Sequence, residues 1–435
     1  MNNNLLKDFI KYAGLNVLGM ISISVYILAD TFFIAKATGE NGLAALNFSI
    51  SIFAIMNSIG LMIGSGSGAQ YSINISRNNQ KVANIVFTSA IKLSLIFGLI
   101  FFTFGMGFSQ KILYFLGARG EALNLANIYL KTIMGFSVFF ILNNVVIAAV
   151  RNDSNPRIAM IGMVVGSLSN IVLDYIFMFI FNMGMFGAAF ATCLSPIISL
   201  LIMSEHFFRG ESEIQFLKHE KIKYIKTIFS LGIPSFITEL SSSITLIVFN
   251  YLFLINAGNT GVAAYAIVAN LALVVVAVFV GISHGLQPLS SKEHGKNNNK
   301  ALRSLVRYSF ILGFIISLLI YGLFYFNREF IVAAFNGEGN SQIAILAENG
   351  IVVYFLGFFF ASINIISGAF FASIERPRQA FVISIFRALI LLVPSAFICS
   401  SMLGIEGIWI SFVITEFLVF LLSLNFLRIL YKNFK

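Results

Sequence analysis

Residues 262–287 read VAAYAIVANLALVVVAVFVGISHGLQ and contain no Asp, Glu, Lys or Arg. A helix of about 20 residues crosses the ~30 Å hydrocarbon core of a bilayer, so this run is long enough to span a membrane. Every backbone N–H and C=O group must be paired inside the bilayer, which leaves only helices and closed barrels. The run is continuously apolar rather than alternating, so it indicates a helix and not a barrel strand.

Apolar runs of similar length recur along all 435 residues. They predict an all-α integral membrane protein with twelve transmembrane helices. We expect the spans at residues 12–34, 43–68, 84–106, 123–150, 158–181, 186–208, 225–255, 262–287, 304–326, 343–373, 379–401 and 405–430.

Composition indicates the same class. The chain is 58% hydrophobic and 11% charged, whereas soluble domains average roughly 45–50% apolar and about 25% charged. Cys193 and Cys399 lie far apart in apolar runs, which argues against a disulfide framework or a thiolate metal site. Lys7 and Lys11 precede the first run, but that run continues past Asp30 without a small-residue cleavage site. We therefore expect a first span there rather than a cleaved signal peptide.

The chain has a formal charge of +10, and its Lys and Arg residues are unevenly distributed between the two sides of the membrane that the predicted spans define. If the N-terminus is cytoplasmic, 23 of the 28 Lys and Arg residues fall on the cytoplasmic side, each being assigned to its nearer side. The five on the outer side are Lys36, Lys111, Arg119, Lys131 and Arg328. Lys and Arg concentrate in cytoplasmic loops, so we expect both termini inside. This distribution accounts for the charge without a nucleic-acid partner.

A polar stretch at residues 209–226 is predicted to be a cytoplasmic linker between two six-helix halves, 1–208 and 227–435. His206 and His219 lie in or beside it, and we expect both to be solvated.

The two halves carry similar short segments about 220 positions apart. The pairs are Asn155-Pro156-Arg157 with Arg376-Pro377-Arg378, Gly184 with Gly404, Gly42 with Gly261, and Gly68 with Gly285. An even number of spans per half gives both halves the same orientation. This pattern is a parallel repeat, as found in transporters, and it predicts a substrate path between the halves.

Two of the four aspartates, Asp30 and Asp174, lie inside predicted spans. A carboxylate at the bilayer centre costs about 2.5–3.5 kcal/mol on insertion scales, so such residues usually face a cavity, pair or bind an ion. A structural hydrogen bond to a helix end or to a basic side chain is the other explanation. Asn170 precedes Asp174 by four residues and therefore lies on the same helix face. Converging carboxyl groups in an apolar environment would favour holding a proton, whereas neutral oxygens beside them would favour Na⁺.

The second half offers Glu239, five residues after Pro234, as its main acid. Glu239 could line a cavity, or it could extend toward the cytoplasmic interface. Glu416 and Arg387 lie in neighbouring predicted spans and can pair with one another.

The sequence contains no CxxC, HExxH, GxSxG or Walker-type phosphate loop. We therefore expect neither an enzyme nor transport powered by ATP bound to this chain, and no catalytic residue is assigned.

Several motifs resemble the multidrug and toxic compound extrusion (MATE) family. The segment Asn170-Ile171-Val172-Leu173-Asp174-Tyr175-Ile176-Phe177, followed by Gly184 and by Gly187-Ala188-Ala189-Phe190-Ala191-Thr192, is similar to the signature of that family. Other similar segments are Asp30-Thr31-Phe32-Phe33-Ile34 with Leu43-Ala44-Ala45, then Gly232, Pro234 and Glu239, and Gly281, Gly285, Gln287 and Pro288. The resemblance covers nearly the whole chain and is greatest to bacterial exporters of the Gram-positive type.

The resemblance implies a V-shaped pair of six-helix lobes in a bacterial plasma membrane. It implies alternating access and export of lipophilic organic cations in exchange for Na⁺ or H⁺, without a cofactor. The matching positions for cation coupling, and for a possible Na⁺ site, are Asp30, Asn170, Asp174 and Thr192. Glu239 and Asp174 are the candidate substrate-binding acids, and we expect the chain to function as a monomer in the lipid bilayer.

Two departures from the family pattern matter. The first span has no proline, and the second half has no aspartate at all. An ion mechanism that needs a second-half aspartate is therefore disfavoured, and Glu239 is the available substitute.

Two other functions remain open on the sequence alone. One is a flippase of the same superfamily that moves lipid-linked oligosaccharides, which would favour a basic cavity. The other is an integral membrane enzyme, which would need a catalytic cluster.

Overall fold

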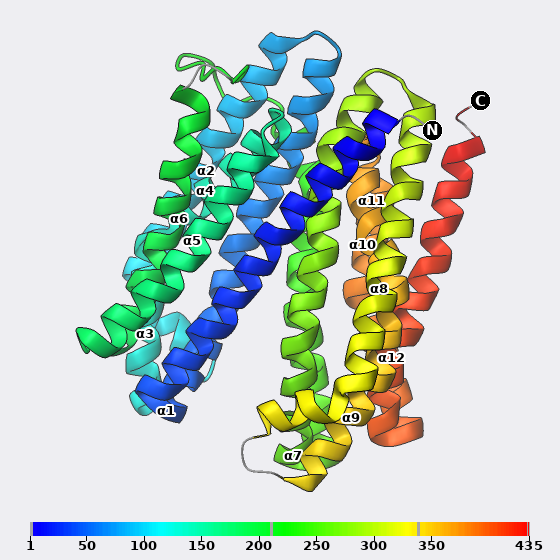
Figure 1. Cartoon of the computed structure of the whole chain (residues 1–435). Coiled ribbons are helices and arrows are strands. Elements are labelled where there is room, and N and C mark those ends of the chain that lie inside the picture. Colours follow the sequence, from blue (N-terminus) through cyan, green and yellow to red (C-terminus); the bar gives the residue numbers. More distant parts are fainter. Residues whose placement is uncertain (1–2, 209–211, 337–339, 433, 435) are drawn as a thin grey trace. The chain divides into compact units, whose positions relative to one another are not determined.

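The computed structural model describes residues 3–208, 212–336, 340–432 and 434, and all regular structure in these residues is helical (Figure 1). The first half of the chain contains α1 (Asn3–Ser76), α2 (Gln80–Phe115), α3 (Gly120–Gly135), α4 (Ser137–Asn152), α5 (Pro156–Tyr175), the π-helical turn η1 (Ile176–Ile180) and α6 (Gly184–Phe208). The second half contains α7 (Ile225–Gly295), α8 (Asn299–Phe335), α9 (Ser341–Tyr354), η2 (Phe355–Gly357), α10 (Phe358–Ser373), α11 (Pro377–Ile385), the π-helical turn η3 (Phe386–Ile390) and α12 (Leu392–Lys432).

Three of these helices contain a backbone break at a glycine. Gly39 in α1 (φ 63°, ψ −154°) and Gly258 in α7 (φ 62°, ψ −152°) have nearly the same conformation, and Gly404 breaks α12 (φ 60°, ψ −133°). L side chains rarely adopt this conformation, whereas glycine does so at little cost. A Cβ at any of the three would meet nothing within 4 Å, so backbone conformation alone requires the glycine.

The breaks account for the number of spans. The described residues contain nine candidate spans when the bent pair α3 and α4 counts as one. Three of the nine are broken at these glycines and cross twice, which gives the twelve transmembrane helices predicted from the sequence. Most helices also run past the apolar stretch, as α2 does at both ends of the predicted span 84–106.

The fourth predicted span, 123–150, is bent rather than straight. Its two helices, α3 and α4, meet at 52° near Phe136, without a proline. Ser137 Oγ donates to the Gly98 carbonyl oxygen of α2 over 2.7 Å. A Cβ at Gly98 would lie 2.6 Å from the Cα of Val138, so α4 approaches α2 more closely than any other residue there would permit.

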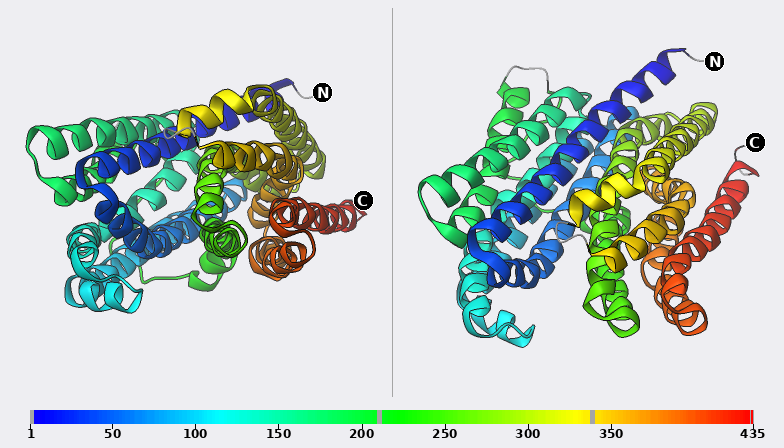
Figure 2. Two further views of the ribbon diagram at one scale, coloured as in Figure 1. Left: turned by 90° about the horizontal axis from the view of Figure 1, so that it is seen from below. Right: turned by 60° about the horizontal axis from the view of Figure 1, so that its bottom comes forward.

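The chain forms two compact units, named here the N unit and the C unit. The N unit contains Leu18–Phe236 and Ser291–Lys296, and the C unit contains Met1–Val17, Ile237–Ser290 and Asn297–Lys435. The helices α1 and α7 therefore each contribute to both units. In the N unit, α5 and α6 pack side by side (Figures 1 and 2).

The start of α1 packs within the C unit, against the second part of α7. A Cβ at Gly285 would lie 2.6 Å from the Cα of Ala13, and one at Gly281 would lie 2.6 Å from the Cα of Val17. Helices in membranes associate through close packing at small residues, and these two glycines permit it here.

The start of α7 packs in the corresponding way within the N unit, against the second part of α1. A Cβ at Gly66 would collide with the Ile228 carbonyl oxygen, and one at Gly232 would collide with the Met62 carbonyl oxygen. These contacts again require glycine at the point where two helices cross.

The core of the C unit is rich in aromatic residues. Trp409 and Phe253 lie with ring centroids 4.4 Å apart, and Tyr354 stacks on Phe412 at 4.1 Å. Aromatic pairs contribute roughly 0.5–1.5 kcal/mol beyond the area that they bury. The core of the N unit is aliphatic over much of its volume, with Ile34, Leu46 and Ile133 fully buried.

Candidate functional site

The four residues predicted for cation coupling come together in the N unit. Asp30 lies on α1, Asn170 and Asp174 lie on α5, and Thr192 lies on α6. Their exposed fractions are 6%, 0%, 0% and 5%. Tyr129 on α3, 5% exposed, joins the same cluster. These five residues are called the acidic cluster below.

Asp174, Asn170 and Thr192 are linked through one amide. In the orientation that suits its neighbours, Asn170 donates from Nδ2 to Asp174 Oδ2 over 3.1 Å. Its Oδ1 then accepts from the backbone N–H of Thr192 over 3.2 Å. The four-residue spacing of Asn170 and Asp174 therefore places both on the face of α5 that meets α6.

Asp30 joins the cluster through Tyr129. The Tyr129 hydroxyl donates to Asp30 Oδ2 over 3.5 Å, and it lies near the Thr192 side chain. The carboxyl groups of Asp30 and Asp174 are close enough to interact electrostatically. Helices far apart in the sequence thus bring two acids into one buried environment.

The π-helical turn η1 begins two residues after Asp174. Such turns widen the helix locally and often occur at functional sites. Here the turn ends the regular α-helical backbone of α5 directly beside the acidic cluster.

The chemistry of the cluster suits a small hard cation or a proton. Asp30 Oδ1 and Asp174 Oδ1 are buried, and neither accepts a hydrogen bond from any described residue. The other groups are the oxygens of Asn170, Thr192 and Tyr129, and hard cations prefer oxygen ligands. No group of three or more His, Cys, Asp or Glu side chains able to hold a metal ion occurs among the residues described. A donor set made of oxygens suits Na⁺ or H⁺.

Tyr129 is a site residue that the sequence analysis did not identify. It lies within the predicted span 123–150 and looks there like any other aromatic residue of an apolar run. Only its contact with Asp30 distinguishes it.

The remaining candidate, Glu239, lies on α7 in the C unit and is half-buried. Its role in substrate binding stays a prediction, as does that of Asp174.

Comparison with known proteins identifies the family. The MatE family model matches residues 17–176 and 234–398, which is most of the chain. The chain belongs to the MATE family. This is a family of membrane transporters rather than enzymes, so the chain is a multi-pass membrane transporter, as its motifs indicated.

One relative of this MATE chain is the "Multidrug export protein MepA" of Staphylococcus aureus (strain MRSA252). It is 28% identical over 288 residues, covering 65% of this chain and 63% of the relative. The matched region therefore spans less than two thirds of the length of MepA.

Two solved structures share the fold. One, described as the outward-facing conformation of a multidrug resistance MATE family transporter of the MOP superfamily, matches with a TM-score of 0.94 at 23% identity. It covers 99% of this chain and 96% of its own. The other is a MOP superfamily transporter from Pyrococcus furiosus, described as having a binding pocket of reverse polarity; it matches with a TM-score of 0.93, 23% identity and the same coverage.

A second buried polar group of this MATE chain lies in the C unit. Arg387 Nε donates to Glu416 Oε1 over 2.5 Å, which confirms the pairing predicted from the sequence. Asn364 donates from Nδ2 to Glu416 Oε2 over 2.8 Å, and Ser423 donates to Asn364 Oδ1 over 3.0 Å. Both carboxylate oxygens of Glu416 are therefore engaged, unlike those of Asp30 and Asp174.

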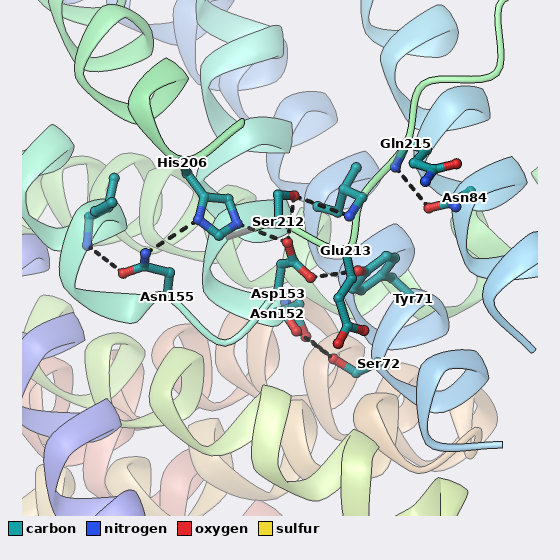
Figure 3. Close-up of polar contacts among 12 residues, drawn as sticks. Tyr71, Ser72, Asn84, Asn152, Asp153, Asn155, His206, Ser212, Glu213 and Gln215 are labelled. Atoms are coloured by element: carbon teal, nitrogen blue, oxygen red, sulfur yellow. Dashed lines mark hydrogen bonds and ion pairs between the residues drawn. The ribbon is translucent and has the colours of Figure 1, made fainter. Parts of the chain in front are cut away.

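The N unit of the transporter contains a third polar group, around Asp153 (Figure 3). Asp153 Oδ1 accepts from the Tyr71 hydroxyl over 2.6 Å, and its Oδ2 accepts from Ser212 Oγ over 2.7 Å. His206 Nε2 lies 2.8 Å from Asp153 Oδ2, and His206 Nδ1 lies 3.3 Å from Asn155 Nδ2. The hydrogen-bonding groups of His206, Asn155 and Asp153 are all paired if His206 Nδ1 accepts from Asn155 and His206 Nε2 donates to Asp153.

The expectation that His206 is solvated is wrong, because its side chain is 1% exposed and it bonds to Asp153. The sequence placed it beside a polar stretch, but α6 extends to Phe208 and carries it into the interior.

The linker of the transporter is held along α2. Its backbone N–H groups at Gln215, Leu217 and Lys223 donate to the side chains of Asn84, Thr88 and Ser89, each over 3.0 Å. Lys223 also bonds to Glu220 over 2.9 Å, and this contact lowers the pKa of the Glu220 carboxyl. The linker from Ser212 onward is therefore an ordered part of the N unit.

Proposed function

We propose that this chain is a secondary active multidrug exporter that exchanges lipophilic organic cations for Na⁺ or H⁺ by alternating access. The observation that carries the proposal is the acidic cluster, where two buried carboxyl groups each keep an oxygen without a hydrogen-bond partner among the described residues. A buried carboxylate is costly unless it is paired, bound to a cation or protonated.

The coupling mechanism follows from that cost. An ion or proton that binds Asp30 and Asp174 stabilises the arrangement of helices in which the two acids converge. A ligand shifts a conformational equilibrium only through its different affinity for the two states. If the ion and the drug prefer different states, the ion gradient drives the drug outward.

Substrate binding is proposed to involve Glu239 and Asp174, because carboxylates attract organic cations. Aromatic side chains add to this attraction, by roughly 0.5–2 kcal/mol for a cation over a ring face. The name of the relative MepA supports multidrug export as the class of activity. The proposed location is the plasma membrane of a bacterium, with both termini cytoplasmic and the monomer as the working unit.

The flippase alternative is less well supported. The main base in the core of the second half is Arg387, and its charge is compensated by Glu416. Arg387 is therefore not available as an unpaired cation to bind a polyanionic lipid-linked oligosaccharide.

The test is efflux of ethidium by the purified chain in proteoliposomes, under a Na⁺ gradient and a H⁺ gradient imposed separately. We expect one gradient to drive efflux, Asp174→Asn to abolish it, and Asp30→Asn to weaken it. Asp8→Asn is the matched control, because it removes the same charge from an exposed position. Normal gradient-driven efflux by a well-folded Asp174→Asn protein would contradict the proposal and leave Asp174 with a structural role.

A further inference from the structure

The C unit contains a groove between α8 and the end of α12. Both helices pack against α10 (Figure 1), and residues of both line the groove. Its volume is about 830 Å³, and none of the residues that line it is acidic. Four of them are basic: Arg303, Arg307, Arg428 and Lys432. We call it the basic groove.

The basic residues lie on matching helix faces. Arg303 and Arg307 are four residues apart on α8, and Arg428 and Lys432 are four residues apart on α12. Side chains at this spacing are neighbours on the helix surface, and like charges there repel one another and destabilise the helix. The groove therefore concentrates positive charge against an energetic cost.

The four cations are not neutralised by this part of the protein. Arg303 is fixed to α12, since it donates to the Tyr431 carbonyl oxygen over 2.8 Å and its guanidinium lies 5.3 Å from the Tyr431 ring. Arg307, Arg428 and Lys432 are exposed and form no ion pair with any described residue. These three cations can therefore bind an anion that is not part of the chain.

The walls of the groove are apolar. Val306 and Leu427 are buried at its floor, and Ile311 and Leu424 are 48% and 39% exposed. A free phosphate or an acidic peptide would leave this apolar surface unused, whereas an acyl chain would cover it.

A second groove of about 800 Å³ continues on the other side of Arg307. It shares Arg307 and Ile311 with the basic groove and is lined by Phe9, Leu312 and Ile315 among others. Arg307 thus lines two grooves with apolar walls, and the second groove also contains Asn298, Lys300 and Ser304. A phospholipid has two acyl chains, one for each groove.

We propose that the basic groove binds an anionic phospholipid, with its phosphate at Arg307 and Arg428 and its acyl chains along both sides of α8. Basic pockets between transmembrane helices recognise acidic headgroups in this way. The predicted orientation puts this end of α8 and α12 at the cytoplasmic leaflet, so the lipid belongs to that leaflet. The general excess of Lys and Arg on this side explains their presence, but not their position around an apolar groove.

The test compares lipid retention by the purified full-length chain in detergent, measured by native mass spectrometry. The probes are dioleoyl-phosphatidylglycerol and dioleoyl-phosphatidylcholine, which differ only in the headgroup. We expect preferential retention of phosphatidylglycerol by the original chain and loss of that preference, by about tenfold, in Arg307→Gln/Arg428→Gln.

The matched control is Arg376→Gln/Arg378→Gln, which removes two exposed charges from the same unit outside the groove. It is expected to keep the preference. An equal loss in both double variants would mean general attraction to a basic surface and would overturn the proposal. Equal retention of both lipids by the original chain, or displacement of phosphatidylglycerol by inorganic phosphate, would overturn it too. Ethidium efflux and gel-filtration elution of each variant establish that it is folded.

Discussion

At the scale of single residues, the buried acids of this chain fall into two kinds. Glu416 has both carboxylate oxygens bonded, to Arg387 and to Asn364. Asp30 and Asp174 each retain an oxygen that accepts no hydrogen bond within the described ranges. A satisfied carboxylate stabilises the packing of helices, whereas an unsatisfied one has capacity to bind an ion or a proton. Satisfaction of hydrogen bonds, rather than burial, therefore separates the two kinds.

Tyr129 provides a test of how the cluster holds its ion. We expect Tyr129→Phe to raise the ion concentration needed for half-maximal efflux by roughly three- to tenfold, because hydrogen bonds to charged groups contribute about 1.5–3 kcal/mol at most and this one is long, at 3.5 Å. Tyr175→Phe is the control, since Tyr175 follows Asp174 directly but is 53% exposed. The measurement is ethidium efflux at graded ion concentrations; an equal shift in both variants would argue against a specific role for Tyr129.

The residues that the sequence predicted are those whose burial is costly. Asp30 and Asp174 are conspicuous in apolar runs because a carboxyl group inside a membrane is energetically costly and therefore rare. Tyr129 could not be predicted, since tyrosine is common in such runs and only its contact with Asp30 on α1 gives it a partner. His206 was placed wrongly for the opposite reason: polar neighbours in the sequence suggested solvent, but the fold buries it against Asp153.

At the scale of elements, the glycine breaks can be tested by comparing the stability changes of two Gly→Ala substitutions, one at a break and one within a regular helix. Gly39 and Gly107 both have open space where a Cβ would go, but only Gly39 has a positive φ. We expect Gly39→Ala to destabilise the protein by about 1–3 kcal/mol, whereas Gly107→Ala, within a regular helix, should be neutral or stabilising by about 0.5–1 kcal/mol. Thermal unfolding in detergent measures both changes. A Gly39→Ala protein as stable as the original would mean that α1 tolerates a different break.

The linker allows a second test at this scale. Asp153 accepts hydrogen bonds from Tyr71 and Ser212 and pairs with His206, so Asp153→Ala leaves buried polar groups unsatisfied at about 1–3 kcal/mol each. We expect faster trypsin cleavage at Lys218 in this variant, because the linker loses its attachment at Ser212. Ser212→Ala removes one of these bonds only and should give an intermediate rate. Cleavage at the original rate in both variants would show that the contacts with α2 are sufficient to hold the linker.

The elements themselves were largely predictable. Apolar runs placed all the spans, since the bilayer requires a helix of fixed minimum length. The bend of α3 and α4 near Phe136 was not predicted, because no proline marks it and the neighbouring contact of α4 with Gly98 cannot be read from the sequence. The extra turns of α2 and α8 beyond the apolar runs were also missed, since hydropathy marks the membrane and not the end of the helix.

At the scale of the whole molecule, the topology can be tested with cysteines. In a background lacking Cys193 and Cys399, Lys218→Cys and Ser341→Cys place thiols at exposed positions. The charge bias predicts that the first is cytoplasmic and the second external. An impermeant maleimide added to intact cells should therefore label only Ser341→Cys. Labelling of both from one side would refute the predicted orientation.

The helix starts have a consequence for the history of the chain. Ala13 packs against Gly285, and Gly232 packs against Gly66. In the sequence, Gly232 lies 219 positions after Ala13, and Gly285 lies 219 positions after Gly66, so the two contacts occupy equivalent places in the two halves. The repeats therefore exchange their first helical segments reciprocally, which is the geometry of domain swapping. Duplication and fusion of the gene for a swapped homodimer would leave this pattern in one polypeptide. In the present chain, each unit contains the first helical segment of the other half, so neither half would complete its core without the other.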